Sequence, residues 1–374
     1  MRFRYSTEEN GKLVKKAAVY TQDEHKINFL DVDSQAVTVV EKLQANGYET
    51  YIVGGAVRDL ILGKKPKDFD IVTSANPSRI KRIFRNARII GRRFRLVHVF
   101  FGPKIFEVST FRSIKDGSTG NVFGTIEEDV KRRDFSINAL FYDPLKQLVI
   151  DYVGGMKDIK KQRVRPIIDM PFIFTDDPVR MIRAVKYGAI AGFKLPFFLK
   201  RTIKKHAFLL ATVSPSRLTE EIFKILHSPC ALKIIINLDA LNLYQHLQPE
   251  AAALMKTKPG FKALYHKTFE NLNSIDFKNE PGEALAALIK DYLEDLVDWG
   301  KKSSIKSGSK TKVNTLGPLL HERFKNAFLL ARKFVLPMNP PRAELDSAVR
   351  LLFQEHGIHI KRIREKTRVN KTVH

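Results

Sequence analysis

The stretch YIVGGAVRDLILGKKPKDFDIVTS, residues 51–74, contains the pattern that decides the fold. An apolar run ending in two glycines, a short helical pattern and a second apolar run predict a strand–helix–strand unit. At the start of the second strand, Asp68 and Asp70 flank Phe69. Because side chains alternate along a strand, we expect the two carboxylates on one face and Phe69 on the other. Two acids this close repel each other, and a divalent cation such as Mg²⁺ removes the conflict.

The residues around the acid pair favour a ligand site, although D-x-D alone also fits a solvated strand edge. Gly54 and Gly55 lie between the strand and the helix, where backbone N–H groups can approach a phosphate. Arg58, one turn into the helix, can reach the same phosphate; the alternative is an ordinary tight turn. A third carboxylate is expected from a neighbouring element, and the sequence leaves Glu107 and Asp134 as candidates. Asp134 has a second interpretation as a residue near a helix N-cap.

The chain is strongly basic, with 65 Lys+Arg against 40 Asp+Glu in 374 residues and a net charge of +25. This excess indicates a polyanionic partner, and nucleic acid before an anionic membrane. The single cysteine, Cys230, excludes an intramolecular disulfide framework and a four-cysteine zinc site, and it fits a reducing, cytoplasmic location. No apolar run has the length of a signal-peptide core at the N-terminus or of a membrane-spanning helix elsewhere.

The order of the sequence patterns predicts an α+β chain. Residues 1–25 are polar and charged and are interpreted as a loose basic arm. Helix and strand patterns alternate over residues 26–160, which predicts a small catalytic head with a mixed sheet. Helical periodicity then predicts a neck over residues 161–230 and an RNA-binding body over residues 231–374, with a basic C-terminal tail. Within the body, residues 300–318 contain five lysines and no acid, which indicates a flexible linker.

Five segments in this order resemble the successive motifs of the class II family of tRNA nucleotidyltransferases (CCA-adding enzymes) and bacterial poly(A) polymerases. They are YIVGGAVRDLILG, KDFDIVTSANP, EEDVKRRDFSINALFYD, DYVGGMKDI and DDPVRMIRA. The resemblance covers about residues 25–260 and implies a DNA polymerase β-like head followed by an all-helical neck and body. It also implies that Asp68 and Asp70 bind two catalytic Mg²⁺ ions and that ATP is a substrate.

The resemblance assigns roles to further positions. Arg133 and Asp134 match a motif associated with the ribose and with catalysis, so Asp134 is the family's third acidic position. Asp177 and Arg180 match the acid and the arginine that read the base edge, while Asp176 departs mildly from the family pattern. Spacing of three residues predicts that Asp177, Arg180 and Arg183 share one helix face. The residues expected to contact ATP are Gly54, Gly55, Arg58, Arg133, Asp177, Arg180 and Arg183.

One segment bears on the product. IIGRRFRLVHV, residues 89–99, resembles the segment that distinguishes bacterial poly(A) polymerases from CCA-adding relatives, and Arg92, Arg93 and Arg95 in it are candidate RNA contacts. We therefore expect template-independent addition of AMP from ATP to RNA 3′ ends, with release of pyrophosphate, by a monomer. The alternatives are a CCA-adding enzyme, a catalytically inactive RNA-binding protein on the same scaffold and a nucleotidyltransferase for small molecules. Residues 261–374 contain no motif with a functional interpretation.

Overall fold

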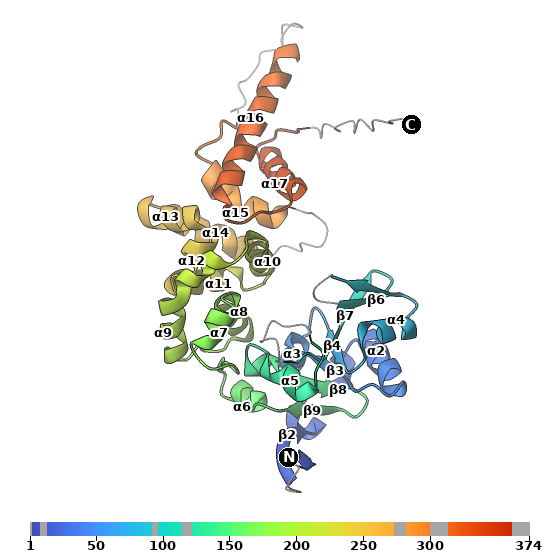
Figure 1. Cartoon of the computed structure of the whole chain (residues 1–374). Helices are drawn as coiled ribbons and strands as arrows, with labels where there is room; N and C mark the ends of the chain where they lie inside the picture. Colours follow the sequence, from blue (N-terminus) through green and yellow to red (C-terminus); the bar gives the residue numbers. More distant parts are fainter. Residues whose placement is uncertain are drawn as a thin grey trace, which may run out of the picture. The chain divides into compact units, whose positions relative to one another are not determined.

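The chain divides into two compact units, of which the first ends at Leu209 and the second begins at Leu210. The computed structural model describes residues 2–7, 13–91, 96–113, 122–272, 282–299 and 313–360. The first unit contains all the described strands, and the regular structure described in the second consists of helices (Figure 1). The predicted α+β class, with a sheet before an all-helical part, is confirmed.

The strands of the first unit form one mixed sheet. They are β1 (Arg2–Thr7), β2 (Leu13–Tyr20), β3 (Thr50–Val53), β4 (Asp70–Thr73), β5 (Ala87–Ile90), β6 (Leu96–Phe101), β7 (Lys104–Thr110), β8 (Leu140–Asp143) and β9 (Leu148–Asp151). The sheet has nine strands in the order β1-β2-β9-β8-β3-β4-β7-β6-β5. β3 runs antiparallel to β4, and β4 runs parallel to β7. The predicted strand–helix–strand unit therefore occupies the centre of the sheet.

Helices make up the remaining regular structure. Those of the first unit, with its 3-10 turns, are α1 (Gln22–His25), η1 (Phe29–Asp31), α2 (Ser34–Ala45), α3 (Gly55–Ile61), α4 (Pro77–Ile83), α5 (Ile126–Lys131), η2 (Ser136–Asn138), α6 (Gly155–Lys160), α7 (Phe172–Asp176), α8 (Val179–Ala191) and α9 (Phe197–His206). The 3-10 turn η3 (Ala207–Thr212) crosses the unit boundary. The second unit contains α10 (Pro215–Leu226), α11 (Ala231–Ala240), α12 (Tyr244–Leu247), α13 (Pro249–Thr257), α14 (Phe261–Leu272), α15 (Glu283–Leu293), α16 (Val313–Phe334) and α17 (Arg342–Glu355). None of the described helices is both long and apolar enough to cross a membrane.

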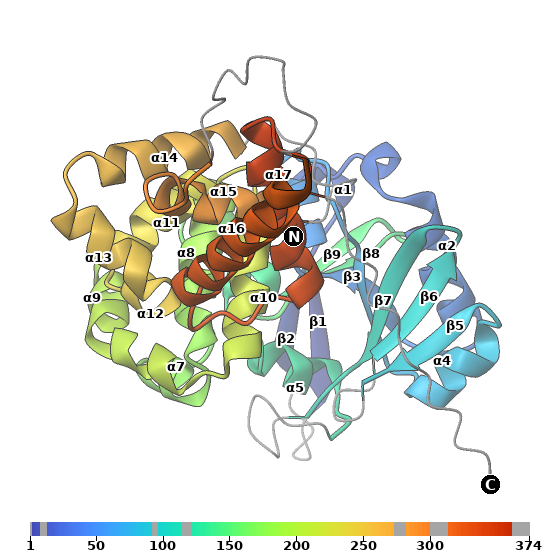
Figure 2. The ribbon, with the colours of Figure 1, turned by 90° about the horizontal axis from the view of Figure 1, so that it is seen from above.

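The first residue of β4 is exposed, whereas the rest of the strand is buried. α2 and α4 contact each other, and α2 packs against β3 and β4 (Figure 2). On the face of the sheet that carries Val53 and Val72, α5 supplies Ile126 and Val130 to a common apolar core. Asp70 lies two residues before Val72, so it is on the same face, but it is exposed. Asp70 is therefore exposed on the face of the sheet that α5 covers further along the strand.

The expectation of a loose arm over residues 1–25 does not hold for its described part. β1 and β2 pair antiparallel, and β2 joins the sheet beside β9 with Ala18 opposite Asp151. Ala17 and Val19 are buried, at 2% and 7% exposure. Lysines stand close to these buried residues in the sequence, so the composition of the segment does not indicate a strand. The pairing of β2 with β9 shows that it is one.

Residues 87–90 form the strand β5, which follows the short basic helix α4. α4 ends at Ile83, and Phe84 after it is extended, with φ −110° and ψ 108°. Ile89 lies opposite Val97 of β6, whose side chain is fully buried. Half-buried and exposed side chains alternate along β5. Pairing with β6 therefore stabilises β5 at the edge of the sheet.

The expected linker over residues 300–318 lies mostly outside the described residues. Its last part, from Val313 on, belongs to α16. The basic tail from residue 361 on also lies outside the described part of the chain.

His25 makes the stability of the first unit sensitive to pH. The ring is 1% exposed, its Nδ1 accepts a hydrogen bond of 3.0 Å from the backbone of Ile27, and its Nε2 donates one of 3.0 Å to the carbonyl of Gln147. These bonds require the neutral ring, and burial lowers the pKa of His25. The unfolded chain binds the proton more readily than the folded chain does. The stabilisation from the buried neutral ring is therefore full above the ordinary histidine pKa of about 6.5 and is lost as the pH falls below that value.

We therefore expect wild-type protein to unfold at lower temperature at about pH 5.5 than at about pH 7.5. The variant His25→Gln should show a smaller change with pH, measured by thermal denaturation. Burial also lowers the pKa values of His246 and His266, so the variant keeps part of the dependence. An identical pH dependence in the variant and the wild type would contradict the role of His25.

Candidate active site

Asp68 and Asp70 lie on either side of a buried side chain, as predicted. Phe69 is 8% exposed and Ile71 is fully buried, whereas both aspartates are exposed. β4 begins at Asp70, so Asp68 lies just before the strand. Two exposed carboxylates on one side of the chain offer the hard oxygen ligands that Mg²⁺ takes, so the donor set fits this ion. Their role as metal ligands remains a prediction.

Gly54 makes room beside Asp70 at the end of β3. Asp70 pairs with Val53 across the two strands, and Gly54 follows Val53 with φ +74° and ψ −136°. A Cβ on Gly54 would lie 3.5 Å from Oδ2 of Asp70, which is ordinary contact distance, but the positive φ disfavours any other residue. The glycine thus allows the chain to turn into α3 next to the carboxylate.

Arg58 is held in place beside the first turn of α3. It is 4% exposed, and its Nη1 donates a hydrogen bond of 2.9 Å to Oδ1 of Asn138, while Asp59 accepts from its Nε. A Cβ on Gly55 would lie 3.6 Å from Nη2 of Arg58. The guanidinium therefore lies next to the glycine turn, where a phosphate is predicted. The sequence did not single out Asn138, although it belongs to the segment RRDFSIN.

The strand register favours Glu107 over Asp134 as the third carboxylate, and the choice between them remains a prediction. Ile71 of β4 lies opposite Val108 of β7 in a parallel register, so Asp70 and Glu107 occupy the preceding positions on the same face. Both side chains are exposed, and Oε1 of Glu107 lies 3.6 Å from Nε2 of His98. Across the described ranges, no three His, Cys, Asp or Glu side chains lie close enough together to hold a metal.

Asp134 lies off the sheet, between α5 and η2. Its side chain is half-buried, and Oδ1 accepts a hydrogen bond of 2.8 Å from the backbone of Phe135. Its own carbonyl accepts from the backbone of Ile167 at 3.1 Å. The N-cap of η2 is Phe135, so Asp134 lies directly before the start of this turn, as its second interpretation had it, but does not itself occupy the N-cap. A single hydrogen bond to Oδ1 leaves the carboxylate with further acceptor capacity, so this contact is compatible with a role in catalysis.

Arg133 connects the loop between α5 and η2 to both of these elements. Its Nη2 lies 2.8 Å from Oδ2 of Asp129, and its Nη1 donates to the carbonyl of Asn138 at 3.3 Å. Because the side chain of Asn138 binds Arg58, one residue connects the two arginines that the sequence assigns to ATP.

Further arginines lie close to Arg132, the residue before Arg133, and concentrate positive charge there. Burial, together with the nearby charges of Arg112, Arg133 and Arg180, lowers the pKa of Arg132 to about 10, and Asp129 opposes this effect. The Nη1 of Arg132 is buried and has no hydrogen-bond partner within the described ranges. Several arginines around one carboxylate form an environment that favours an anion. Sequence reasoning missed Arg112 and Arg132, because only the fold brings them together.

The base-reading residues take positions that differ in part from the prediction. Asp177 precedes α8, so it does not share a helix with Arg180 and Arg183; its Oδ1 accepts from the backbone of Val179 at 3.2 Å. Arg180 is 4% exposed, and its Nη1 lies 2.6 Å from Oδ2 of Asp176. Arg183 is half-buried on α8. Asp176, which departs from the family pattern, therefore helps to orient Arg180, together with the carbonyl of Ile173, which accepts from the same Nη1 at 3.2 Å.

The segment DYVGGMKDI has a structural role. Both carboxylate oxygens of Asp151 accept backbone hydrogen bonds at the start of α6, including 2.7 Å from Gly154 and 3.0 Å from Met156. A Cβ on Gly155 would collide with the carbonyl oxygen of Ser136, so only glycine fits there. This close approach holds η2, and with it Asn138, near α6.

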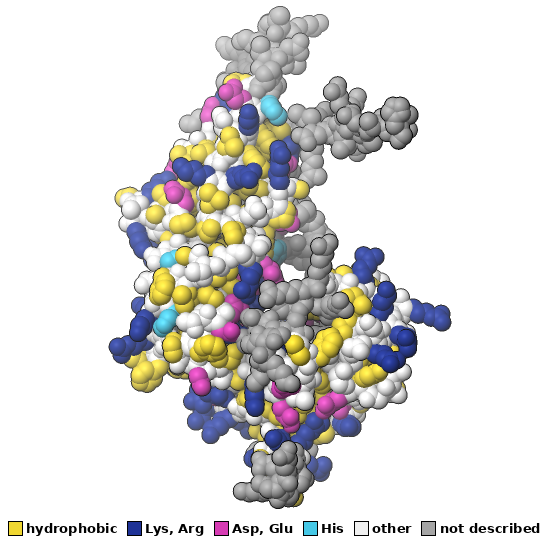
Figure 3. All heavy atoms as spheres, viewed as in Figure 1, with side chains coloured by type: hydrophobic (Ala, Val, Ile, Leu, Met, Phe, Trp, Pro, Cys, Tyr) yellow, Lys and Arg dark blue, Asp and Glu magenta, His cyan; other side chains and the backbone are white. Residues whose placement is uncertain are grey.

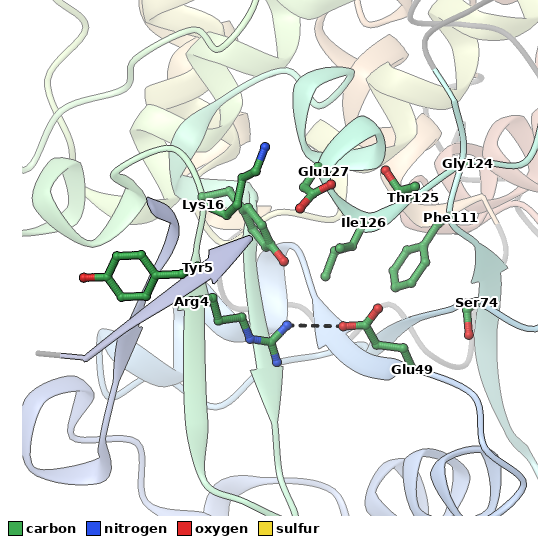
Figure 4. A pocket seen from close by; sticks show the side chains of 11 residues that line it. Arg4, Tyr5, Lys16, Glu49, Ser74, Phe111, Gly124, Thr125, Ile126 and Glu127 are labelled. Carbon is green, nitrogen blue, oxygen red and sulfur yellow. Dashed lines mark hydrogen bonds and ion pairs between the residues drawn. The ribbon is translucent and has the colours of Figure 1, made fainter. Parts of the chain in front are cut away.

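A pocket of about 460 Å³ lies at the N-terminal end of α5 (Figure 4). Its lining includes Arg4, Glu49 and Phe111 but none of the residues predicted to contact ATP or metal. Figure 4 shows Arg4 directed toward Glu49, and the two side chains lie 3.2 Å apart. Arg4 also donates to the hydroxyl of Tyr51 at 3.0 Å, so these contacts fasten the β1–β2 hairpin to β3. The predicted RNA contacts Arg92, Arg93 and Arg95 lie outside the described residues.

A mixed sheet with a central strand that begins at a D-x-D pair, beside a glycine turn and a short helix, is the arrangement expected of a nucleotidyltransferase head. Residues 50–165 match the family described as the poly A polymerase head domain. Residues 192–255 match the family described as the probable RNA and SrmB-binding site of polymerase A. Both matches agree with the resemblance to poly(A) polymerases and CCA-adding enzymes stated from the motifs, over the residues that they cover.

Relatives of both kinds are found. The chain is 42% identical over 250 residues to poly(A) polymerase I of Escherichia coli O6:H1, which covers 63% of this chain and 54% of that protein. Identity to poly(A) polymerase I of Haemophilus influenzae is 42% over 248 residues, or 61% of this chain and 54% of that protein. Identity to the CCA-adding enzyme of Geobacillus thermodenitrificans is 37% over 207 residues, or 54% and 51% of the two chains. The chain spans about half the length of these curated relatives.

Solved structures show the same fold. The CCA-adding enzyme of Bacillus stearothermophilus in complex with CTP is 26% identical, with a TM-score of 0.54 over 86% of this chain and 82% of that chain. An apo CCA-adding enzyme at 22% identity has a TM-score of 0.55 over 90% and 86% of the two chains. The arrangement of a mixed-sheet head followed by helices is therefore confirmed.

Proposed function

We propose that the chain transfers AMP from ATP to the 3′ end of RNA and releases pyrophosphate. The observation that carries this proposal is the exposed pair Asp68 and Asp70, on either side of buried Phe69, at the start of β4 beside Gly54. The greater identity to poly(A) polymerase I than to the CCA-adding relative supports AMP as the transferred group. The single cysteine supports a reducing, cytoplasmic compartment, and a monomer remains our prediction.

The residues around the pair fit an in-line phosphoryl transfer. Asp68 and Asp70 would hold Mg²⁺, which when bound activates the attacking hydroxyl and offsets charge on the leaving pyrophosphate. Arg58, fixed by Asn138 next to the glycine turn, would bind the ATP phosphates from the start of α3. Arg133 would approach the ribose from the loop that Asn138 shares. No covalent enzyme intermediate is required.

Base selection is proposed for the start of α8. Asp177 offers an acceptor and Arg180 a donor, and two such groups can distinguish nucleobases by their edges without a template. Asp176 binds Arg180 and thereby limits the directions in which its guanidinium can donate. Arg183, one turn further along α8, would contribute positive charge to the same nucleotide.

A CCA-adding activity is the second candidate. It is favoured by the 37% identity to the Geobacillus enzyme and by the solved CCA-adding enzymes with the same fold. Such an enzyme would incorporate CMP as well as AMP and would require a tRNA-like end.

We expect the purified chain to extend a generic single-stranded RNA with ATP and Mg²⁺ and to leave it unextended with CTP. Each nucleoside triphosphate is supplied separately, and extension is read on a denaturing gel. The same chain carrying Asp70→Asn gives the background of the assay. Incorporation of CMP, or extension restricted to tRNA-like ends, would overturn the AMP-specific proposal in favour of CCA addition.

A further inference from the structure

Three phenylalanine rings are exposed on α9 and just after it. Phe197, Phe198 and Phe208 are 72%, 70% and 61% exposed. The rings of Phe197 and Phe198 lie edge to face, with centroids 5.7 Å apart. Burial of such rings is strongly favourable, so three of them left in water within 12 residues indicate a binding surface.

Cations accompany these rings. Lys200, Arg201, Lys204 and Lys205 are all exposed on α9. The surrounding residues 192–213 contain no aspartate or glutamate. Figure 3 shows hydrophobic and basic side chains next to one another over α9. The surface therefore combines apolar rings with uncompensated positive charge.

α9 places Phe197, Arg201 and Lys204 in one row, and Phe208 follows in the 3-10 turn η3, which continues directly from α9. Leu199 and Ile203 are buried and fix which side of α9 faces inward. On the opposite side, the spacing i, i+4, i+7 and i+11 lines up a ring, two cations and a second ring. At 1.5 Å per residue this row is about 17 Å long, which matches about five nucleotides stacked at about 3.4 Å each. We call the row of Phe197, Arg201, Lys204 and Phe208 the α9 stripe.

We propose that the α9 stripe binds single-stranded RNA, with bases stacked on Phe197 and Phe208 and phosphates bound by Arg201 and Lys204. Aromatic platforms combined with cations bind single strands without reading their sequence. Protein–protein interfaces are depleted in lysine, so the lysines and the missing acids favour a polyanion. The proposal rests on the proposed function in taking RNA as substrate. It assigns a surface and a binding mode within the 64-residue region whose family description names RNA.

Affinity for a fluorescent oligoadenylate, measured by anisotropy on the full chain without ATP, tests the stacking. The double variant Phe197→Leu/Phe208→Leu should bind at least about tenfold more weakly, because leucine keeps the apolar bulk and loses the stacking ring. The matched variant Phe197→Tyr/Phe208→Tyr keeps the rings and should bind like the wild type. Thr202→Ser, on the same helix but outside the stripe, controls for the helix itself. Equal affinity in the leucine variant would overturn the proposal, as would weak binding in the tyrosine variant.

Salt dependence tests the binding of phosphates by the two cations. In the variant Arg201→Ala/Lys204→Ala, the slope of log affinity against log salt should become shallower by about 1.4, at about 0.7 for each phosphate that the variant no longer neutralises. An unchanged slope would overturn the assignment of phosphates to these cations. Thermal unfolding of each variant confirms that the fold is kept.

Measurements of KM and kcat distinguish the proposed RNA surface on the α9 stripe from the proposed active site. The leucine variant should raise the KM for a long RNA about tenfold and keep kcat at saturating RNA. A lowered kcat with unchanged oligoadenylate affinity would mean that α9 acts through α8, and it would overturn the RNA surface. Absence of AMP transfer by the wild type would overturn the proposed function, while oligoadenylate affinity would still report on the stripe.

Discussion

Replacing Asp70 with asparagine is expected to reduce AMP transfer about a thousandfold. The exposed carboxylate at the start of β4 lies beside Gly54 and shares its face with Glu107 of β7. Asparagine keeps the shape and loses the charge that holds Mg²⁺, whose effect on the transition state is several kcal/mol. At 1.36 kcal/mol for each factor of ten, about 4 kcal/mol corresponds to three orders of magnitude. Single-nucleotide addition at saturating ATP and RNA measures the loss.

Three further variants serve as a control and as a comparison for this result. Asp23→Asn removes an exposed carboxylate of α1, away from the proposed site, and should leave turnover unchanged. Glu107→Gln and Asp134→Asn compare the two candidates for the third carboxylate, and the strand register predicts the greater loss for Glu107. Turnover retained in Asp70→Asn at the wild-type rate would refute the metal assignment altogether.

Replacing Asp158 with alanine is expected to destabilise the first unit by about 3 kcal/mol. The carboxylate is 1% exposed and accepts hydrogen bonds from Ser136 at 2.6 Å and from Arg163 and Arg165 at 2.7 Å each. Breaking a buried ion pair costs about 3–5 kcal/mol. The lower end applies here, because both arginines are more than a third exposed and regain water. Chemical denaturation followed by circular dichroism measures the change.

The same variant is expected to lose activity, because Ser136 begins η2, which ends at Asn138, the partner of Arg58. Asp295→Ala provides the control, since it removes an exposed carboxylate that pairs with Lys258 at the surface. Such a pair contributes about 0–1 kcal/mol. Equal stabilities of Asp158→Ala and the wild type would show that the Asp158 network does not hold the first unit.

The sequence by itself determined the centre of the fold and the alternation at the acid pair. Strand periodicity places Phe69 and Ile71 inside and both aspartates outside, and burial confirms this. It also determined the switch from strands to helices, because the change of period from two to 3.6 is a local property. The motifs, which are local too, indicated the family.

Tertiary structure decided which distant residues meet. Glu107 became the favoured third carboxylate only through the parallel register of β4 and β7, and no local pattern encodes that register. Asn138, Arg112 and Arg132 entered the site because η2 packs against α3 and because Arg112, after β7, meets α5 at Asp129. The N-terminal strands were hidden for the same reason: a short, charged alternation becomes a strand only when a neighbouring strand supplies its hydrogen bonds.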